Sequence, residues 1–119
     1  ILLVDDDPDL LALFEAFRGE GGFEVDSRQS GAAAVSYLTG CGKPGLIVMD
    51  LLMPELDGWG FRDVQRTNPD YRDVPVVFLT GLPEEQADIR ELAAEAVLHK
   101  PIDPDELLEV VVGLLRASG

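Results

Sequence analysis

Apolar and polar residues follow one another in a unit that recurs five times along the chain. Each unit has a short apolar run, a polar turn, and a longer stretch whose apolar residues recur at helical spacing. We expect strands at residues 1–4, 23–27, 46–49, 74–79 and 96–99. The run at 46–49 has no polar alternation, which is typical of a strand covered by helices on both faces.

Residues that favour helix starts follow the strands. Asp7 is expected to cap the first helix, with Pro8 at its first position, and Ser30 to cap the second. Pro83 is expected to begin the fourth helix, and Asp103 to cap the last one in a capping box. Strands that alternate strictly with helices predict a parallel α/β sheet with right-handed crossovers.

The common strand order for five such units, 2-1-3-4-5, places the first and third strands side by side. Ligands bind outside the carboxyl ends of the strands at that point. Asp5 and Asp6 follow the first strand and Asp50 the third, while Thr80 and Lys100 follow the fourth and fifth. We therefore expect these five residues to meet at one edge of the sheet.

Three carboxylates at one sheet edge repel one another, and a divalent cation relieves that repulsion. Oxygen ligands without histidine or thiolate favour Mg²⁺, Mn²⁺ or Ca²⁺ over zinc or copper. The acidic run at residues 5–9 does not fit a calcium-binding loop, because Leu10 stands where that loop needs Gly and Ala16 where it needs Glu. We interpret Asp7 and Asp9 as helix-start residues.

The same edge suits phosphoryl transfer. A carboxylate such as Asp50 can act as a nucleophile toward phosphorus and form an aspartyl phosphate. The metal and the Lys100 ammonium would offset charge on the equatorial oxygens of the transition state. Thr80 offers a hydroxyl to a phosphoryl oxygen, and Gly81 beside it leaves room for a phosphodonor or water. Pro101 biases Lys100 toward extended geometry.

Length and charge limit the other function classes. At 119 residues the chain is expected to form one domain. Its 9 Lys and Arg against 23 Asp and Glu give a net charge of −14, which argues against nucleic acid or an anionic membrane as a direct partner. A single cysteine, Cys41, excludes a disulfide within the chain and fits a reducing cytoplasm. Because the chain begins at Ile1 inside a strand, we expect it to be part of a longer protein.

Four segments, LLVDDDP, VMDLLMPELDG, VVFLTG and LHKP, occur in this order along the chain. With them, residues 1–119 resemble a single response-regulator receiver domain of two-component signalling. The resemblance implies a flavodoxin-like fold and a phosphoryl group transferred to Asp50 from the phosphohistidine of a sensor histidine kinase or phosphotransfer protein. It also implies an output domain or protein, which the sequence does not name.

The resemblance also assigns roles at the site. Mg²⁺, with Mn²⁺ as the alternative, would be held by Asp6, Asp50 and the backbone carbonyl of Leu52. Asp5 would orient metal-bound water. Lys100 would contact the phosphoryl group, and Thr80 would swing toward it.

The chain departs from the family pattern in two places. Val97 stands at a position that is often Tyr or Phe, so a signal must pass through Thr80 and the loop and helix after it. The stretch AAEAVL lacks the Gly often found before the fifth strand, and the interval between Thr80 and Lys100 is short. The first departure concerns the route of the signal, and the second concerns the geometry of the fourth helix. The chemistry of the site does not depend on them.

Two other functions compete with a phosphorylation switch. A hydrolase of the haloacid-dehalogenase type would need a second Asp two residues after the nucleophile, where this chain has Leu52. A binding module that is no longer phosphorylated would not need the full set of carboxylates, hydroxyl and ammonium. We therefore expect a signalling domain that catalyses only its own phosphorylation and dephosphorylation, and no turnover of an external substrate.

Overall fold

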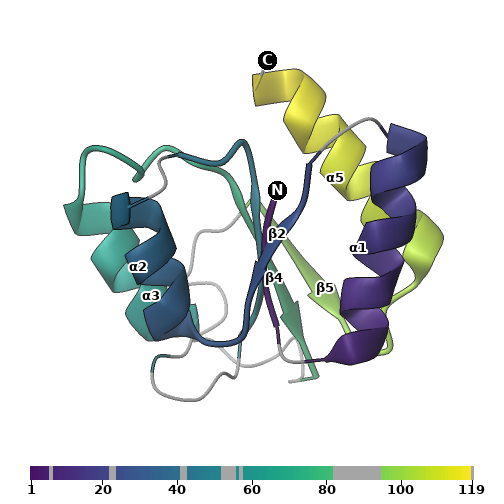
Figure 1. Ribbon diagram of the computed structural model, residues 1–119, viewed down its shortest axis with the longest axis horizontal. Coiled ribbons are helices and arrows are strands. Elements are labelled where there is room, and N and C mark those ends of the chain that lie inside the picture. Colours follow the sequence, from purple (N-terminus) through teal and green to yellow (C-terminus); the bar gives the residue numbers. More distant parts are fainter. Residues whose placement is uncertain are drawn as a thin grey trace.

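A five-stranded parallel sheet organises the fold (Figure 1). The structure is a computed structural model that describes residues 1–5, 7–21, 24–40, 43–51, 56, 58–81 and 95–118. Its strands are β1 (Leu2–Val4), β2 (Asp26–Arg28), β3 (Ile47–Asp50), β4 (Val76–Thr80) and β5 (Ala96–His99). Their order is β2-β1-β3-β4-β5 and every neighbouring pair is parallel, which confirms the predicted topology.

Helices cover both faces of this sheet, as predicted. The described helices are α1 (Pro8–Gly21), α2 (Gly31–Gly40), α3 (Gly58–Thr67) and α5 (Pro104–Ser118). Figure 1 shows α2 and α3 on one side of the sheet and α1 and α5 on the other. The expected helix at Pro83 and the residue Cys41 lie outside the described residues.

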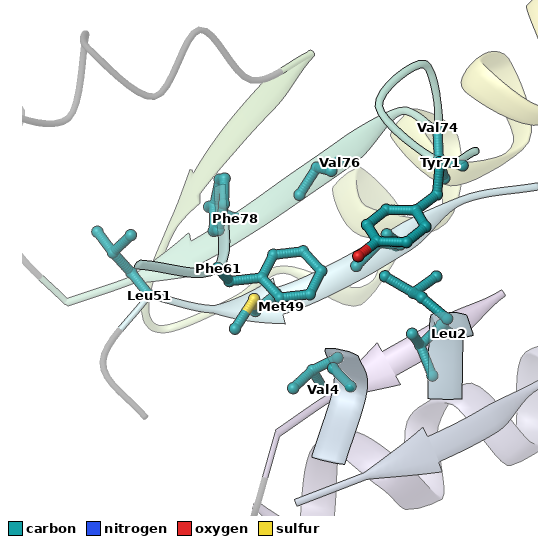
Figure 2. Packing of buried hydrophobic residues seen from close by; sticks show 12 residues of the cluster. Leu2, Val4, Met49, Leu51, Phe61, Tyr71, Val74, Val76 and Phe78 are labelled. Carbon is teal, nitrogen blue, oxygen red and sulfur yellow. The ribbon is translucent and has the colours of Figure 1, made fainter. Parts of the chain in front are cut away.

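The core has two halves because successive strand residues point to opposite faces. Leu2, Met49 and Phe78 belong to the half beneath α2 and α3, which Figure 2 shows closing around Phe61. Leu3 and Val48 belong to the half beneath α1 and α5. The side chains at 2–4, 47–49 and 76–79 are almost completely buried, which explains why these apolar runs carry no polar alternation.

The boundaries of four strands differ from the predicted ones, and the smallest difference is at β1, which begins at Leu2 instead of residue 1. β2 lies at Asp26–Arg28 because it pairs with β1, whose three residues offer only three partners. β4 begins only at Val76, because Pro75 has no N–H to donate to a ladder. β3 extends to Asp50, which stands opposite Leu79 in the register of β4.

Side-chain oxygens cap three helices at the predicted residues. Asp7 Oδ1 accepts a hydrogen bond from the Asp9 N–H at 2.9 Å, and Ser30 Oγ accepts one from the Ala33 N–H at 3.1 Å. The cap of α5 is Asp103, whose Oδ1 accepts from the N–H of residue 105 at 2.9 Å. Each cap satisfies a backbone donor that the helix itself leaves without a partner. The helices therefore begin at fixed points close to the strand ends.

The buried side-chain amide of Gln65 holds the chain near the start of β4, at the end opposite to the carboxyl ends of the strands. Gln65 is fully buried, and its Nε2 donates to the carbonyl oxygens of Tyr71 at 3.2 Å and Val74 at 2.9 Å. Its Oε1 accepts from Nη1 of Arg62, itself nearly buried, at 2.8 Å. One side chain thus ties α3 to the loop that leads into β4.

We expect the Gln65→Leu variant to lose about 1–3 kcal/mol of unfolding free energy, because buried carbonyls and a guanidinium lose their partner. Urea unfolding followed by circular dichroism measures the loss. Gln29 is exposed, and Gln29→Leu serves as the control that should stay within about 0.5 kcal/mol of the parent. Equal stability of the two variants would contradict a structural role for this amide.

Candidate functional site

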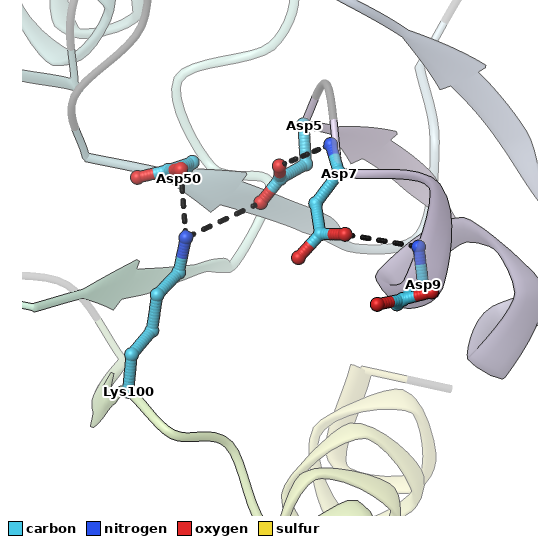
Figure 3. Close-up of polar contacts among 5 residues, drawn as sticks. All are labelled: Asp5, Asp7, Asp9, Asp50 and Lys100. Carbon is cyan, nitrogen blue, oxygen red and sulfur yellow. Dashed lines mark hydrogen bonds and ion pairs between the residues drawn. The ribbon is translucent and has the colours of Figure 1, made fainter.

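The strand register brings charged side chains from three strands together at the carboxyl edge of the sheet. Asp5 directly follows β1, Asp50 ends β3, and Lys100 directly follows β5. The structure thus brings together three of the residues that the sequence predicted at this edge (Figure 3). Asp6 and Leu52, the other two predicted metal-binding positions, lie outside the described residues.

Lys100 links the two carboxylates. Its Nζ donates a hydrogen bond to Asp50 Oδ2 at 2.9 Å and lies 4.0 Å from Asp5 Oδ2, within ion-pair range. The Asp5 side chain is completely buried, while 14% of the Asp50 side chain and 35% of the Lys100 side chain are exposed. The phosphoacceptor candidate is therefore reachable from solvent, whereas its acidic neighbour is not.

Asp5 uses its two oxygens differently. Its Oδ1 accepts a hydrogen bond from the backbone N–H of Asp7 at 2.8 Å, which fixes the turn between β1 and α1. Its Oδ2 faces the Lys100 ammonium, as Figure 3 shows. The turn therefore holds a negatively charged oxygen inside the site.

The charges around Lys100 outweigh its partial burial. Burial lowers the pKa of this ammonium, but the hydrogen bond to Asp50 and the charges of Asp50 and Asp5 raise the pKa above its ordinary value. The charge of Asp7 adds to this effect. While the carboxylates are ionised, the Lys100 ammonium therefore stabilises the fold below the ordinary lysine pKa of about 10.4, and that stabilisation disappears as pH rises through the raised pKa.

Thr80 and Gly81 complete the described edge. Thr80 is almost fully buried, and its carbonyl oxygen accepts the backbone N–H of Lys100 at 2.7 Å. A Cβ added at Gly81 would meet no atom of the described residues within 4 Å, so the described part of the chain leaves space beside this strand end. The peptide bond between Lys100 and Pro101 is cis, whereas sequence reasoning expected from this proline only a bias toward extended geometry.

The oxygen donors at this edge fit a hard divalent cation. The carboxylates of Asp5 and Asp50 both face the Lys100 ammonium. Mg²⁺ commonly binds one or two carboxylates together with waters. Within the described residues no group of three or more metal-ligating side chains occurs; the third predicted carboxylate, Asp6, lies outside them. The donor chemistry therefore suits Mg²⁺ or Mn²⁺.

Sequence reasoning did not foresee that Asp7 contributes to the site. It was interpreted as a helix cap only, but its charge also acts on Lys100. Both residues border an open cleft of about 360 Å³ between the start of α1 and the segment after β5. The position of Asp7 in the sequence indicates this role, because Asp7 lies only two residues beyond Asp5 at the same strand end. The cleft lies beside Lys100, and neither Asp5 nor Asp50 lines it.

We expect Asp50→Asn to lower the pKa of Lys100, because the amide keeps the shape of the side chain but removes the charge that raises this pKa. NMR titration of the lysine Cε signals measures the change. Asp9→Asn is the control and should leave the value unaltered, because Asp9 is an exposed helix residue that has no part in the shift. An unchanged Lys100 pKa in Asp50→Asn would contradict the ion pair.

Proteins of known sequence resemble this chain over nearly its whole length. Response regulator Rre1 of Synechocystis is 36% identical over 118 residues, which are 97% of this chain and 51% of the relative. RpaA of the same organism, a DNA-binding dual master transcriptional regulator, is 35% identical over 99% of this chain and 49% of its own length. The chain thus spans about half the length of the curated relatives it matches.

Solved structures show the same fold. The signal receiver domain of a histidine kinase from Syntrophus aciditrophicus superposes with a TM-score of 0.86 at 31% identity, covering 98% of this chain and 89% of that one. The receiver domain of a sensor histidine kinase from Pseudomonas aeruginosa, with magnesium coordinated in its active-site cleft, gives 0.82 at 27% identity and covers 97% and 95%. The family model of the response regulator receiver domain matches residues 1–112. The chain therefore belongs to the response regulator receiver domain family.

Proposed function

We propose that this domain is a phosphoacceptor switch in which Asp50 takes a phosphoryl group from the phosphohistidine of a sensor kinase or phosphotransfer protein. The observation that carries the proposal is the contact of Lys100 Nζ with Asp50 Oδ2 at 2.9 Å, in a cluster of charges that includes the buried Asp5. An ammonium held against the attacking carboxylate is well placed to meet the incoming phosphoryl oxygens.

The proposed transfer forms one bond and breaks one. A carboxylate oxygen of Asp50 attacks phosphorus, the P–N bond of the phosphohistidine breaks, and the imidazole leaves with that electron pair. Lys100 neutralises charge on the equatorial oxygens, and the Thr80 hydroxyl donates to one of them. Hydrolysis of the acyl phosphate is a separate step: water attacks phosphorus, the bond between phosphorus and the Asp50 oxygen breaks, and the carboxylate and inorganic phosphate are released. The domain thus acts on itself and turns over no external substrate.

A divalent cation belongs to the proposal. Asp5, Asp6, Asp50 and the carbonyl of Leu52 would hold Mg²⁺ or Mn²⁺ directly or through water, and the cation would supply electrostatic stabilisation of the transferring group. The oxygen donors at the described edge support this assignment, and the related Pseudomonas domain contains magnesium in its cleft. Lys100 remains charged throughout because its pKa is raised.

The switch itself would act by changing the relative populations of two conformations of the domain. Phosphorylation adds about one negative charge beside Lys100 and Thr80, which favours the arrangement in which both contact the phosphoryl group. A coupling of about 1–3 kcal/mol changes partner affinity by roughly 5- to 150-fold. Val97 is only partly buried and carries no ring, so Thr80 and the chain that follows it transmit the change toward β5 and α5.

The partners follow from charge and from the relatives. We propose a sensor histidine kinase or phosphotransfer protein as the phosphodonor, and an output domain or protein that reads the switch. With a net charge of −14, the receiver part itself makes no direct contact with nucleic acid, although a full-length relative is a DNA-binding regulator. We place the domain in the cytoplasm within a longer protein. No described helix has the length and apolar character required to cross a membrane.

Incubation with Mg²⁺ and acetyl phosphate should add one phosphoryl group to the domain, and Asp50→Asn should abolish the addition because the nucleophile is lost. Intact-protein mass spectrometry measures the product. Asp63 is an exposed carboxylate on α3, and Asp63→Asn should be labelled like the parent. Labelling that persists in Asp50→Asn would contradict the assignment of Asp50 as the phosphoacceptor. Continuous release of phosphate at high turnover would favour a hydrolase instead.

Mg²⁺ should stabilise the fold, because a ligand that binds only the folded state at about 100 times its dissociation constant adds about 2.7 kcal/mol. Urea unfolding in Mg²⁺ and in EDTA measures the difference. Asp5→Asn should lose most of this gain, because the amide keeps an oxygen for the Asp7 N–H but removes the buried charge. An undiminished gain in Asp5→Asn would exclude that carboxylate from the metal site.

A further inference from the structure

Two hydrogen bonds hold Asp7 in place where β1 leads into α1. Its backbone N–H donates to Asp5 Oδ1 at 2.8 Å, and its own Oδ1 accepts the backbone N–H of Asp9 at 2.9 Å. The first bond fixes the backbone of Asp7 next to a buried carboxylate, and the second fixes the direction of its exposed side chain. Asp7 therefore presents a negative charge at a defined place beside the phosphoacceptor edge.

The charge of Asp7 acts on the side chain that contacts Asp50. It is one of the charges that raise the pKa of the Lys100 ammonium, and Nζ of Lys100 donates to Asp50 Oδ2 at 2.9 Å. Figure 3 shows the Asp7 carboxylate between the Lys100 ammonium and Asp9. The charge of Asp9 has no part in the shift. Of these two neighbouring carboxylates, Asp7 is therefore the one that influences the site electrostatically.

Asp7 and Lys100 also border the same open cleft of about 360 Å³. Lys100 connects this cleft with the phosphoacceptor, because its partly exposed side chain lines the cleft while its Nζ contacts Asp50. A molecule that approaches Lys100 from this side passes the carboxylate of Asp7. The repulsion that it meets there grows with its own negative charge. The position of Asp7 can therefore distinguish phosphate compounds by their charge.

We propose that Asp7 is a specificity-determining residue for the phosphodonor: its charge disfavours dianionic donors such as small acyl phosphates and thereby favours N–P donors whose nitrogen-containing group is protonated. This inference rests on the proposed function. A phosphohistidine with a protonated ring is such a donor, and its imidazole leaves as a neutral molecule when the P–N bond breaks. The same charge slows phosphorylation of the domain by free acyl phosphates, so the switch responds mainly to a protein donor.

Two small donors of different charge test the proposal. Acetyl phosphate is a dianion at neutral pH, and its P–O bond breaks on attack by the Asp50 carboxylate, with release of acetate. Phosphoramidate is protonated on nitrogen and has a less negative net charge, and its P–N bond breaks with release of ammonia. Intact-protein mass spectrometry at saturating Mg²⁺ gives both rates of phosphorylation. The ratio of the acetyl phosphate rate to the phosphoramidate rate cancels any effect of a substitution that the two donors share.

Asp7→Asn should raise this ratio about 2- to 5-fold, the size expected for one exposed charge, because the amide removes the charge but keeps an oxygen for the helix cap. The rise should shrink at high salt, which screens charges at the surface. Asp9→Asn is the matched control, because Asp9 lines the same cleft without acting on Lys100. It should keep the parental ratio.

The outcomes separate this inference from the proposed function. A parental ratio in Asp7→Asn would overturn the inference, and so would an equal rise in Asp9→Asn, because the effect would then belong to the overall charge. A parent that neither donor labels would overturn the proposed function instead. Urea unfolding verifies that the variants are folded, and Asp7→Ser, which also supplies a neutral cap, repeats the test should Asp7→Asn fail to fold.

Discussion

Repulsion between carboxylates at one edge of a parallel sheet is the constraint on which the chemistry of this domain depends. Parallel pairing of β1 with β3 forces Asp5 and Asp50 to the same edge, and burial of Asp5 removes much of the water that would screen them. Lys100 offsets part of that repulsion from two strands away. The edge still has more negative than positive charge, which is the electrostatic condition that attracts a divalent cation.

The topology and the central cluster could be predicted from sequence because both follow from periodic patterns. Uninterrupted apolar runs such as Val76–Leu79 identify buried strands, and the first polar residue after each run marks the carboxyl edge. The strand order then brings Asp5, Asp50 and Lys100 together without knowledge of any side-chain detail. The roles that the family resemblance assigns to these residues remain predictions.

Features that depend on tertiary packing could not be predicted in this way. The bounds of β2 are set by the length of its partner β1, and sequence periodicity within β2 carries no information about that length. The close approach of Leu56 to Gly31 joins residues far apart in the sequence, and the effect of Asp7 on the pKa of Lys100 depends on where the Lys100 ammonium lies. The cis peptide bond before Pro101 has no local signature beyond the proline itself.

The sheet ends on both sides in short strands, β2 with three residues and β5 with four. An exposed strand edge invites pairing with another chain, and short, charged edges discourage it. β2 bears Asp26 and Arg28 within its three residues. The outermost backbone groups of β2 therefore provide a poor template for pairing with a strand of another chain.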